Sequence, residues 1–241
     1  MAGRRPVIEL LRGGGSVQRI LVAQGVKMSG PVGEIRRRAG EAGIPVRMVP
    51  RSELDRVAPS LNHQGVVALT GRFRYTPLED MLARSPLALL LLDGVTDPHN
   101  LGSLIRSAEV AGFTGVVVPS HRSAQVNPTV RRVAAGAAEL VPVARVTNLT
   151  RAMEDAKKAG AWVLGLDAAA DEVLWDSDLA EPPVALVLGS EGKGLTRGVA
   201  AHCDALVSIP LMGRLDSLNV AVAGALAMFE VARRRRDSAT L

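Results

Sequence analysis

The sequence predicts an α/β protein with a mainly parallel sheet, preceded by a small α/β domain. From residue 88 onward, short apolar runs alternate with segments that repeat apolar residues at helical spacing, which is typical of parallel strands covered by helices. The first third differs in charge: residues 1–76 carry 13 Lys and Arg against 5 Asp and Glu, whereas residues 77–241 carry 16 against 19. Between these parts, residues 71–86 lose their periodicity and contain two prolines.

These features divide the chain into a basic domain at residues 1–71, a linker at 72–86 and a larger domain at 87–241. The excess positive charge of the basic domain favours binding of a polyanion, and a solvated basic surface is the alternative. Within this domain, short apolar runs predict strands and apolar residues at helical spacing predict a helix. The strands are expected at residues 19–23, 46–49 and 65–69, and the helix at 31–42.

In the larger domain, continuous apolar runs predict buried strands, and the amphipathic segments between them predict helices. The strands are expected, in order, at residues 88–92, 115–118, 140–143, 161–166, 184–188 and 206–209. The helices are expected at residues 101–111, 129–138, 149–159 and 218–235. The last helix ends in four arginines at 233–236, and positive charge stabilises a helix C-terminus.

Composition excludes several classes of protein. Of the 241 residues, 47% are hydrophobic, which suits a buried core and argues against long disorder. The single cysteine, Cys203, excludes an internal disulfide framework and a zinc site built mainly on cysteines, and it fits a reducing cytoplasm. The most continuous apolar run, residues 87–92, is far shorter than the roughly 20 residues of a membrane helix, and the first residues do not resemble a secretory signal. We expect a soluble cytoplasmic protein without a metal centre or a membrane partner.

Three loops that follow predicted strands have unusual compositions, and ligands of open α/β sheets usually lie beyond the carboxyl ends of the strands. The first loop, residues 93–100, precedes the helix predicted at 101–111, and Asn100 is suited to cap that helix. The apolar stripe of the helix does not include Arg106. Arg106 therefore has either a functional role or a surface position, paired with Glu109.

The second loop, residues 189–195, contains three glycines that allow the backbone to approach a ligand closely. It fits neither the phosphate-binding loop nor the dinucleotide-binding pattern, and an ordinary glycine-rich turn with an exposed Glu191 is the alternative. The third loop, residues 209–219, leads into the last predicted helix. Ser217 is suited to cap that helix, and Asn219 is expected in its first turn.

In this order and spacing, the three loops resemble the three motifs of the SpoU (TrmH-type) RNA 2′-O-ribose methyltransferases, a branch of the SPOUT superfamily. The matching motifs are Asp97-Pro98-x-Asn100-x-Gly102-x-x-x-Arg106-x-Ala108, Leu188-Gly189-Ser190-Glu191-Gly192-x-Gly194 and Ile209-Pro210-x-x-Gly213-x-x-x-Ser217-Leu218-Asn219-Val220. The resemblance extends over residues 90–229. It implies a trefoil knot near the C-terminus, a homodimer, and S-adenosylmethionine as cofactor.

The basic domain points to one subgroup of this family. Two motifs, Arg4-x-Pro6-Val7-x-Glu9-x-Leu11 and Asn62-His63-Gln64-Gly65-Val66, are similar to the substrate-binding domain of RlmB-like enzymes. Those enzymes methylate a guanosine ribose in large-subunit (23S) ribosomal RNA, whereas transfer-RNA enzymes of the TrmH type typically lack the domain. The resemblance therefore implies that residues 1–71 bind substrate RNA. We interpret His63 as a hydrogen-bonded turn residue without a catalytic role.

The resemblance also implies which residues form the site. The cofactor pocket would be formed by Leu188, Gly189, Gly192, Ile209, Leu211 and Leu218. The residues implied in catalysis are Asn100, Arg106, Glu191, Ser217 and Asn219. Two positions depart from the family: Leu211 stands where methionine is frequent, and Ala221 stands where serine is frequent. Neither departure removes a polar group that we assign to the chemistry.

Methyl transfer to a ribose hydroxyl is an in-line attack, which requires positioned reactants and loss of the hydroxyl proton. The resemblance implies Arg106 as the general base, assisted by a phosphate and by Ser217. Because arginine is effectively always protonated, we interpret Arg106 as a phosphate clamp that stabilises the developing alkoxide. Asn100, Glu191 and Asn219 would orient Arg106 and the ribose.

Three alternatives stay open. The methylated ribose belongs either to a guanosine of ribosomal RNA, or to an adenosine, as in related antibiotic-resistance enzymes with the same two domains, or to a guanosine of transfer RNA. In another class of function, the chain is a non-catalytic RNA-binding or ribosome-assembly protein with this fold. The polar residues retained in the three loops argue against a pure binding protein. Only 2% of the residues are aromatic, which argues against recognition dominated by base stacking.

Overall fold

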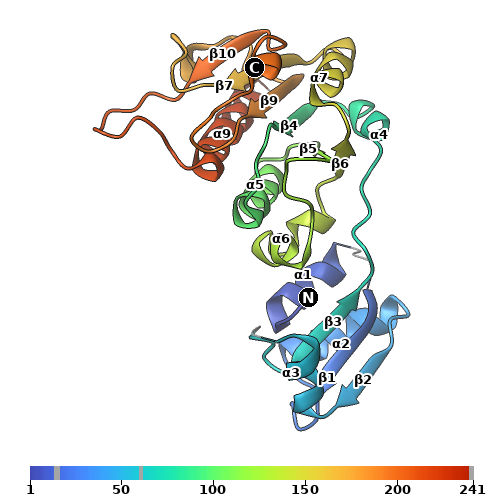
Figure 1. The fold of residues 1–241 in the computed structure, drawn as a ribbon. Coiled ribbons are helices and arrows are strands. Elements are labelled where there is room, and N and C mark those ends of the chain that lie inside the picture. The colour runs from blue at the N-terminus through green and yellow to red at the C-terminus, as the bar shows by residue number, and fades with distance from the viewer. Residues whose placement is uncertain (14–16, 60–61, 239–241) are drawn as a thin grey trace. The chain divides into compact units, whose positions relative to one another are not determined.

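The structure is a computed structural model that describes residues 1–13, 17–59 and 62–238. Contacts between residues divide the chain into two compact units (Figure 1). The N-terminal unit comprises Met1–Arg74 together with Val126–Leu140, and the C-terminal unit comprises Tyr75–Gln125 and Val141–Leu241. A segment from the middle of the chain therefore belongs to the N-terminal unit. Both units combine helices with a sheet, which confirms the predicted fold class.

The N-terminal unit is built on a three-stranded sheet of order β2-β1-β3. The central strand, β1 (Val17–Ala23), is parallel to β2 (Val46–Val49) and antiparallel to β3 (Val66–Thr70). The helices packed on this sheet are α1 (Arg4–Arg12), α2 (Pro31–Glu41) and α3 (Arg51–Val57). The strands and α2 lie within a few residues of their predicted positions.

Successive residues of β1 point to opposite faces of the sheet, so the strand serves two apolar clusters. Ile20 and Val22 pack with side chains of α1 and α2. Leu21 and Ala23 pack with Leu54 of α3. Neither α1 nor α3 is among the predicted elements. α1 has nine residues with a proline in its first turn, and α3 has seven residues and buries a single side chain, so both are too short to show a long apolar repeat.

His63 holds a turn that precedes β3. Its buried ring accepts the backbone N–H of Gly65 at Nδ1 (3.0 Å), so Nε2 carries the proton and donates to Asp55 (2.9 Å). Arg4 donates to the carbonyl oxygen of Gln64 in the same turn (3.1 Å). The two N-terminal motifs therefore contact each other, and His63 is a hydrogen-bonded turn residue, as interpreted from the sequence.

The middle segment of the N-terminal unit differs from the prediction of one helix over residues 129–138. It forms α6 (Pro128–Val133) and a short 3-10 helix, η1 (Ala137–Glu139). Between them Ala135 has φ +51° and Gly136 has φ +99°, so the backbone turns to left-handed values that end a helix. At Gly136 a Cβ atom would lie 2.5 Å from the Cβ of Glu9, which explains the glycine.

A buried ion pair ties this segment together. Arg131 of α6 is 7% exposed and donates from Nε to the carboxylate of Glu139 (2.7 Å). It also donates from Nη1 to the hydroxyl of Thr70 (2.7 Å), the last residue of β3. The contact with Thr70 joins residues 61 positions apart and attaches α6 to the sheet of the N-terminal unit.

The C-terminal unit contains a seven-stranded sheet of order β6-β5-β4-β9-β7-β10-β8, in which all neighbouring strands are parallel. The strands are β4 (Ala88–Leu92), β5 (Gly115–Pro119), β6 (Val143–Val146), β7 (Trp162–Leu166), β8 (Glu172–Val173), β9 (Val184–Leu188) and β10 (Ala205–Ser208). The parallel sheet confirms the prediction. The trefoil knot implied by the resemblance stays a prediction.

Helices cover both faces of this sheet (Figure 1). They are α4 (Leu78–Leu82), α5 (Pro98–Val110), α7 (Leu149–Lys158), α8 (Arg197–Ala200) and α9 (Val220–Ser238), with a 3-10 helix, η2 (Leu174–Asp176). Met81 of α4, Met153 of α7 and Val199 of α8 share one apolar cluster with Leu89 and Leu91 of β4. Among the described residues, no helix is both long and apolar enough to cross a membrane.

On the other face, α5 and α9 pack against each other. Gly224 of α9 allows this close approach. A Cβ atom there would lie 2.5 Å from side-chain atoms of Leu104 on α5 and of Leu188 at the end of β9. Leu188 is therefore fixed at the junction of the sheet and both helices.

Several predicted boundaries are wrong. The strand expected at 140–143 lies at Val143–Val146, because Arg145 faces solvent on an edge strand and interrupts the apolar pattern. The last helix begins at Val220 rather than at residue 218. The stretch predicted as a linker contains α4, whose Met81 is fully buried. The short elements α8 and β8 are not among the predictions, because they span too few residues to show a periodicity.

Candidate active site

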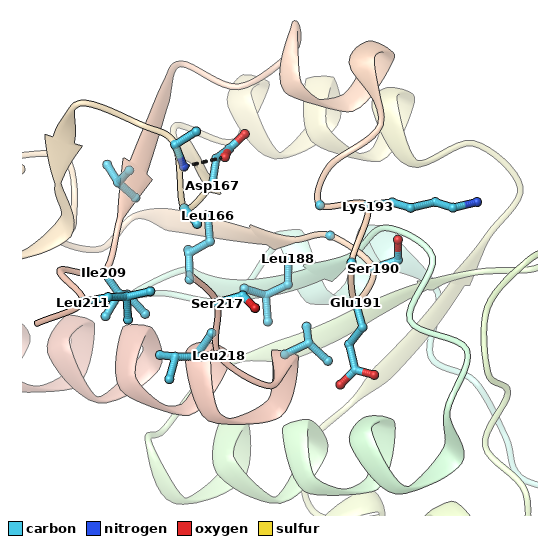
Figure 2. Close-up of a pocket in the computed structure, with 18 residues that line it drawn as sticks. Leu166, Asp167, Leu188, Ser190, Glu191, Lys193, Ile209, Leu211, Ser217 and Leu218 are labelled. Atoms are coloured by element: carbon cyan, nitrogen blue, oxygen red, sulfur yellow. Dashed lines mark hydrogen bonds between the residues drawn. The ribbon is translucent and has the colours of Figure 1, made fainter. Parts of the chain in front are cut away.

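A pocket of about 360 Å³ lies at the carboxyl ends of β7, β9 and β10 (Figure 2), a volume within the range of small-molecule sites. Its lining comes from the loop after β7, from the loop after β9, and from the segment between β10 and the first turn of α9. The second and third of these segments are the loops singled out in the sequence. The expected location beyond the strand ends therefore agrees with the structure.

All six residues that the resemblance implies for the cofactor line this pocket. They are Leu188, Gly189, Gly192, Ile209, Leu211 and Leu218. The leucines and the isoleucine give the pocket apolar walls. The glycines expose the backbone of the loop after β9. Such a lining suits a flat, largely apolar group that also needs hydrogen bonds from backbone groups.

The loop after β9 is closed on itself. Ser190 and Gly194 exchange backbone hydrogen bonds of 3.0 and 2.9 Å. At Gly189 a Cβ atom would lie 2.1 Å from the carbonyl carbon of Gly194, so any larger residue would force this loop open. Lys193 also belongs to the lining, but its side chain points away from the pocket in Figure 2.

The first loop caps its helix differently from the prediction. The residue before α5 is Asp97, whose carboxylate accepts the N–H of His99 (3.0 Å). This backbone hydrogen bond lowers the pKa of Asp97. The prediction that Asn100 caps the helix is wrong, because Asn100 lies within the first turn and is only 9% exposed. Its side-chain amide is free to reach the second loop.

Glu191 joins the three loops. One carboxylate oxygen, Oε1, accepts the amide of Asn100 (2.9 Å) and the amide of Asn219 (2.6 Å). The amide of Asn219 also donates to Oδ1 of Asn100 (3.1 Å). Glu191 is exposed, as the alternative expects, but its carboxylate is also the acceptor on which two asparagine side chains converge.

The cap of α9 also differs from the prediction. Asn219 immediately precedes this helix, and its Oδ1 accepts the N–H of Ala221 (3.0 Å) and of Val222 (3.3 Å). Asn219 is therefore the cap, and the predicted cap Ser217 is wrong because the helix begins two residues later than expected. Ser217 instead lines the pocket.

Arg106 does not line the pocket of its own chain. It is exposed on α5, and it has no hydrogen bond or ion pair among the described residues, so the alternative pairing with Glu109 is absent there as well. Arg106 lies six residues after Asn100, which turns its direction by about 240° around the helix axis. The structure therefore brings four of the five residues implied in catalysis together and leaves Arg106 on another face of α5.

The sequence reasoning missed the loop after β7. Leu166, Asp167, Ala168 and Ala169 all line the pocket. The position of this loop was a usable signal, because the loop follows the carboxyl end of the strand predicted at 161–166. It lacks the glycines and the motif that distinguished the other loops. Within the described ranges, no group of three or more His, Cys, Asp or Glu side chains is placed to hold a metal ion.

Comparisons with known proteins identify the family that this chain is similar to. Residues 87–229 match the SpoU rRNA Methylase family, and residues 2–76 match a domain described as RNA 2′-O ribose methyltransferase substrate binding. A Mycobacterium ulcerans protein named as a tRNA/rRNA methyltransferase is 43% identical over 97% of this chain and 76% of its own length. A Staphylococcus aureus protein of the TrmH family of tRNA/rRNA methyltransferases is 39% identical over 98% of this chain and 96% of its own.

Two solved structures are similar along nearly the whole chain. The SpoU methyltransferase AviRb from Streptomyces viridochromogenes, in complex with AdoMet, has a TM-score of 0.82 and 27% identity, covering 99% of this chain and 90% of its own. An AdoMet-bound rRNA methyltransferase from Sinorhizobium meliloti has a TM-score of 0.81 and 29% identity, covering 97% of this chain and 86% of its own.

Proposed function

Because this chain belongs to the SpoU rRNA methylase family of S-adenosylmethionine-dependent RNA methyltransferases, we propose that it methylates the 2′-hydroxyl of a ribose in RNA. The observation that carries the proposal is the convergence of the second and third loops on one pocket, with the first loop attached to them through Glu191. A guanosine of 23S ribosomal RNA is the proposed substrate, because the basic N-terminal unit matches a substrate-binding domain.

The pocket fits S-adenosylmethionine. Apolar walls formed by Leu188, Ile209, Leu211 and Leu218 suit the adenine ring, and backbone groups of the glycine loop can satisfy its polar edge. Of the described lining residues, Lys193 alone is cationic, and it points away, so the positively charged sulfonium meets no repulsion from the pocket wall. When bound, the cofactor would supply a methyl group to the ribose oxygen, with sulfur keeping the electron pair of the broken S–C bond and the hydroxyl proton passing to water.

The residues of the network position the reactants. Hydrogen bonds among Glu191, Asn100 and Asn219 hold the three loops together, and in-line transfer requires that the groups binding the two reactants have fixed positions. The hydroxyl of Ser217 borders the pocket and is proposed to contact the substrate phosphate. These residues fix geometry, and none of them carries the positive charge that a developing alkoxide would need nearby.

We assign that charge to Arg106 of a second copy of the chain. Arg106 is exposed on α5, four residues before Val110, so both side chains lie on one face of the helix. Val110 is 62% exposed, and Phe229 of the adjacent α9 is 49% exposed. Large apolar side chains so exposed favour burial against another protein surface. A homodimer formed through α5 and α9 would bury these side chains and carry Arg106 to the partner's pocket.

In this position Arg106 would act as a clamp. Arginine side chains are effectively always protonated, so an arginine in its ordinary state cannot accept the hydroxyl proton. Its planar guanidinium binds phosphate and stabilises negative charge on oxygen. The clamp role and the general-base role both require Arg106, and they predict opposite pH dependence for a lysine variant, because a clamp needs the protonated amine and a base needs the neutral one.

Incubation with S-adenosylmethionine carrying a labelled methyl group tests the proposed substrate. Unmodified 23S ribosomal RNA and unmodified transfer RNA serve as parallel acceptors, followed by digestion to nucleosides. We expect label in 2′-O-methylguanosine from the 23S RNA. Label in 2′-O-methyladenosine or in transfer RNA would favour an alternative substrate. Binding of RNA without binding of S-adenosylmethionine would favour a non-catalytic RNA-binding protein.

A further inference from the structure

Asp167 places a carboxylate in the pocket that the family motifs do not contain. It directly follows β7 and lines the pocket, and in Figure 2 it lies on the side opposite Glu191. Its Oδ1 accepts the backbone N–H of Ala169 (2.9 Å), which fixes the direction of the side chain. The neighbouring Ala168 and Ala169 have short side chains, so they leave space beside the carboxylate.

The acceptor capacity of Asp167 is not exhausted. A carboxylate offers about four lone-pair sites, and the hydrogen bond from Ala169 occupies one of them. Asp167 forms no ion pair with any described residue, and the ammonium of Lys193 points away from the pocket. A negative group that borders an apolar cavity without a cation is therefore available to donors of a bound ligand.

We propose that Asp167 binds the vicinal hydroxyls of the cofactor's own ribose. This inference rests on the proposed function. Two adjacent hydroxyls present two uncharged donors, which a carboxylate accepts through hydrogen bonds to both oxygens. The acceptor is charged and its direction is fixed before binding, so little ordering is needed when the ligand enters.

The other donors of the cofactor fit Asp167 less well. Its ammonium group is joined to a carboxylate, which would be brought close to Asp167 where no described cation offsets the repulsion. The adenine amino group is part of a flat ring that matches the leucine-lined wall of the pocket. The ribose is therefore the part of the ligand whose chemistry matches the carboxylate.

Isothermal titration of the full chain with three ligands tests this assignment. The ligands are S-adenosylhomocysteine, its 2′,3′-dideoxy analogue, and 5′-methylthioadenosine, which keeps the ribose but lacks the amino-acid part. The variants are Asp167→Ala and Asp167→Asn. Asp171→Ala is the matched control, because Asp171 is exposed and does not line the pocket.

We expect Asp167→Ala to weaken both ribose-containing ligands by the same factor, about tenfold or more, since a hydrogen bond to a charged group is lost. The dideoxy analogue should bind Asp167→Ala and the wild type equally, and Asp171→Ala should bind all ligands normally. Asp167→Asn, which retains an acceptor for Ala169, should show a smaller loss and serves in place of the alanine variant if that variant does not fold.

Unchanged affinities in both Asp167 variants would overturn the assignment. A loss confined to S-adenosylhomocysteine would also overturn it, because Asp167 would then contact the amino-acid part. An equal loss for the dideoxy analogue would point to adenine instead and overturn it as well. Failure of the wild type to bind S-adenosylhomocysteine would overturn the proposed function itself, so the two failures are distinguishable.

Discussion

The carboxylate of Glu191 accepts the side-chain amide of Asn219 at 2.6 Å, although the two residues are 28 positions apart. The same oxygen accepts the amide of Asn100, which lies 91 positions from Glu191. Glu191 follows β9, Asn219 precedes α9, and Asn100 lies in the first turn of α5. One charged acceptor thus fixes three chain segments, and hydrogen bonds to a charged group are stronger than those between neutral groups.

This arrangement gives Asn219 two separable roles, in capping α9 and in holding Glu191. Asn219→Ala removes both, and we expect a loss of about 1–2 kcal/mol in the free energy of unfolding together with loss of methyl transfer. Asn219→Ser keeps a cap but is too short to reach Glu191, so it should retain most of the stability and still lose activity. Urea unfolding and methyl-transfer assays on both variants check this. An active serine variant would show that the contact with Glu191 is dispensable.

The position of Arg106 predicts complementation between two inactive variants. Arg106→Ala should bind S-adenosylmethionine normally and transfer no methyl group, whereas Gly189→Val should lose the pocket because its side chain collides with Gly194. In a mixed dimer, the intact pocket of the first chain would face Arg106 of the second. About a quarter of the wild-type activity is expected after random exchange of subunits in a two-fold dimer.

The control for this experiment is each variant alone, which should remain inactive at every concentration. A mixture that also remains inactive, despite exchange of subunits shown by differently tagged chains, would contradict the assignment of Arg106 to the partner's pocket. The pH profile of Arg106→Lys distinguishes the two chemical roles, because a clamp loses activity as the lysine is deprotonated at high pH, whereas a general base gains activity.

The sequence predicts the parallel core of this protein well, for a physical reason. β4 and β9 are buried on both faces of the sheet and therefore consist of unbroken apolar runs. Such short, unbroken runs are typical of the strands of a parallel sheet. The two loops that line the pocket, residues 189–195 and 209–219, also have recognisable compositions, the first rich in glycine and the second with a proline and a glycine. The predicted helix caps are wrong because each helix has two suitable capping residues near its start, Asp97 and Asn100 for α5 and Ser217 and Asn219 for α9. Only the residue at which the helix begins decides between them.

Other features depend on contacts that no local pattern contains. Arg131 lies within the stretch predicted as one helix and Glu139 directly follows it, but their ion pair is buried because α6 packs against Thr70 of a distant strand. Asp167 occupies a loop of ordinary composition, and only the geometry of the pocket distinguishes it from Asp171.

The ion pair in the N-terminal unit predicts a large and specific loss of stability. Arg131→Met would leave the buried carboxylate of Glu139 without its cation, and removing one partner of a buried pair costs about 3–5 kcal/mol. Arg132→Met on the same helix is the control, because Arg132 is exposed and should have little effect. Urea unfolding measures both. Equal losses in the free energy of unfolding for the two variants would show that the ion pair between Arg131 and Glu139 makes no specific contribution to stability.

The ion pairing of the arginines in the N-terminal unit predicts which of them bind RNA. Arg47 and Arg51 are exposed and have no ion pair among the described residues, whereas Arg37 and Arg38 are paired with glutamates of α2. Changing the first two to glutamine should weaken RNA binding and reduce the slope of log affinity against log salt by up to about 0.7–0.9 for each lost phosphate contact. The double glutamine variant of Arg37 and Arg38 has the same charge and should have a smaller effect.

The most direct test of the central claim locates the methyl group on the RNA. The protein is incubated with unmodified 23S RNA and a labelled methyl donor, and the RNA is then hydrolysed in alkali. Alkaline cleavage requires a free 2′-hydroxyl, so methylation of that oxygen should leave the label in a dinucleotide that resists hydrolysis. Recovery of all the label in mononucleotides would place the methyl group on a base and contradict the account.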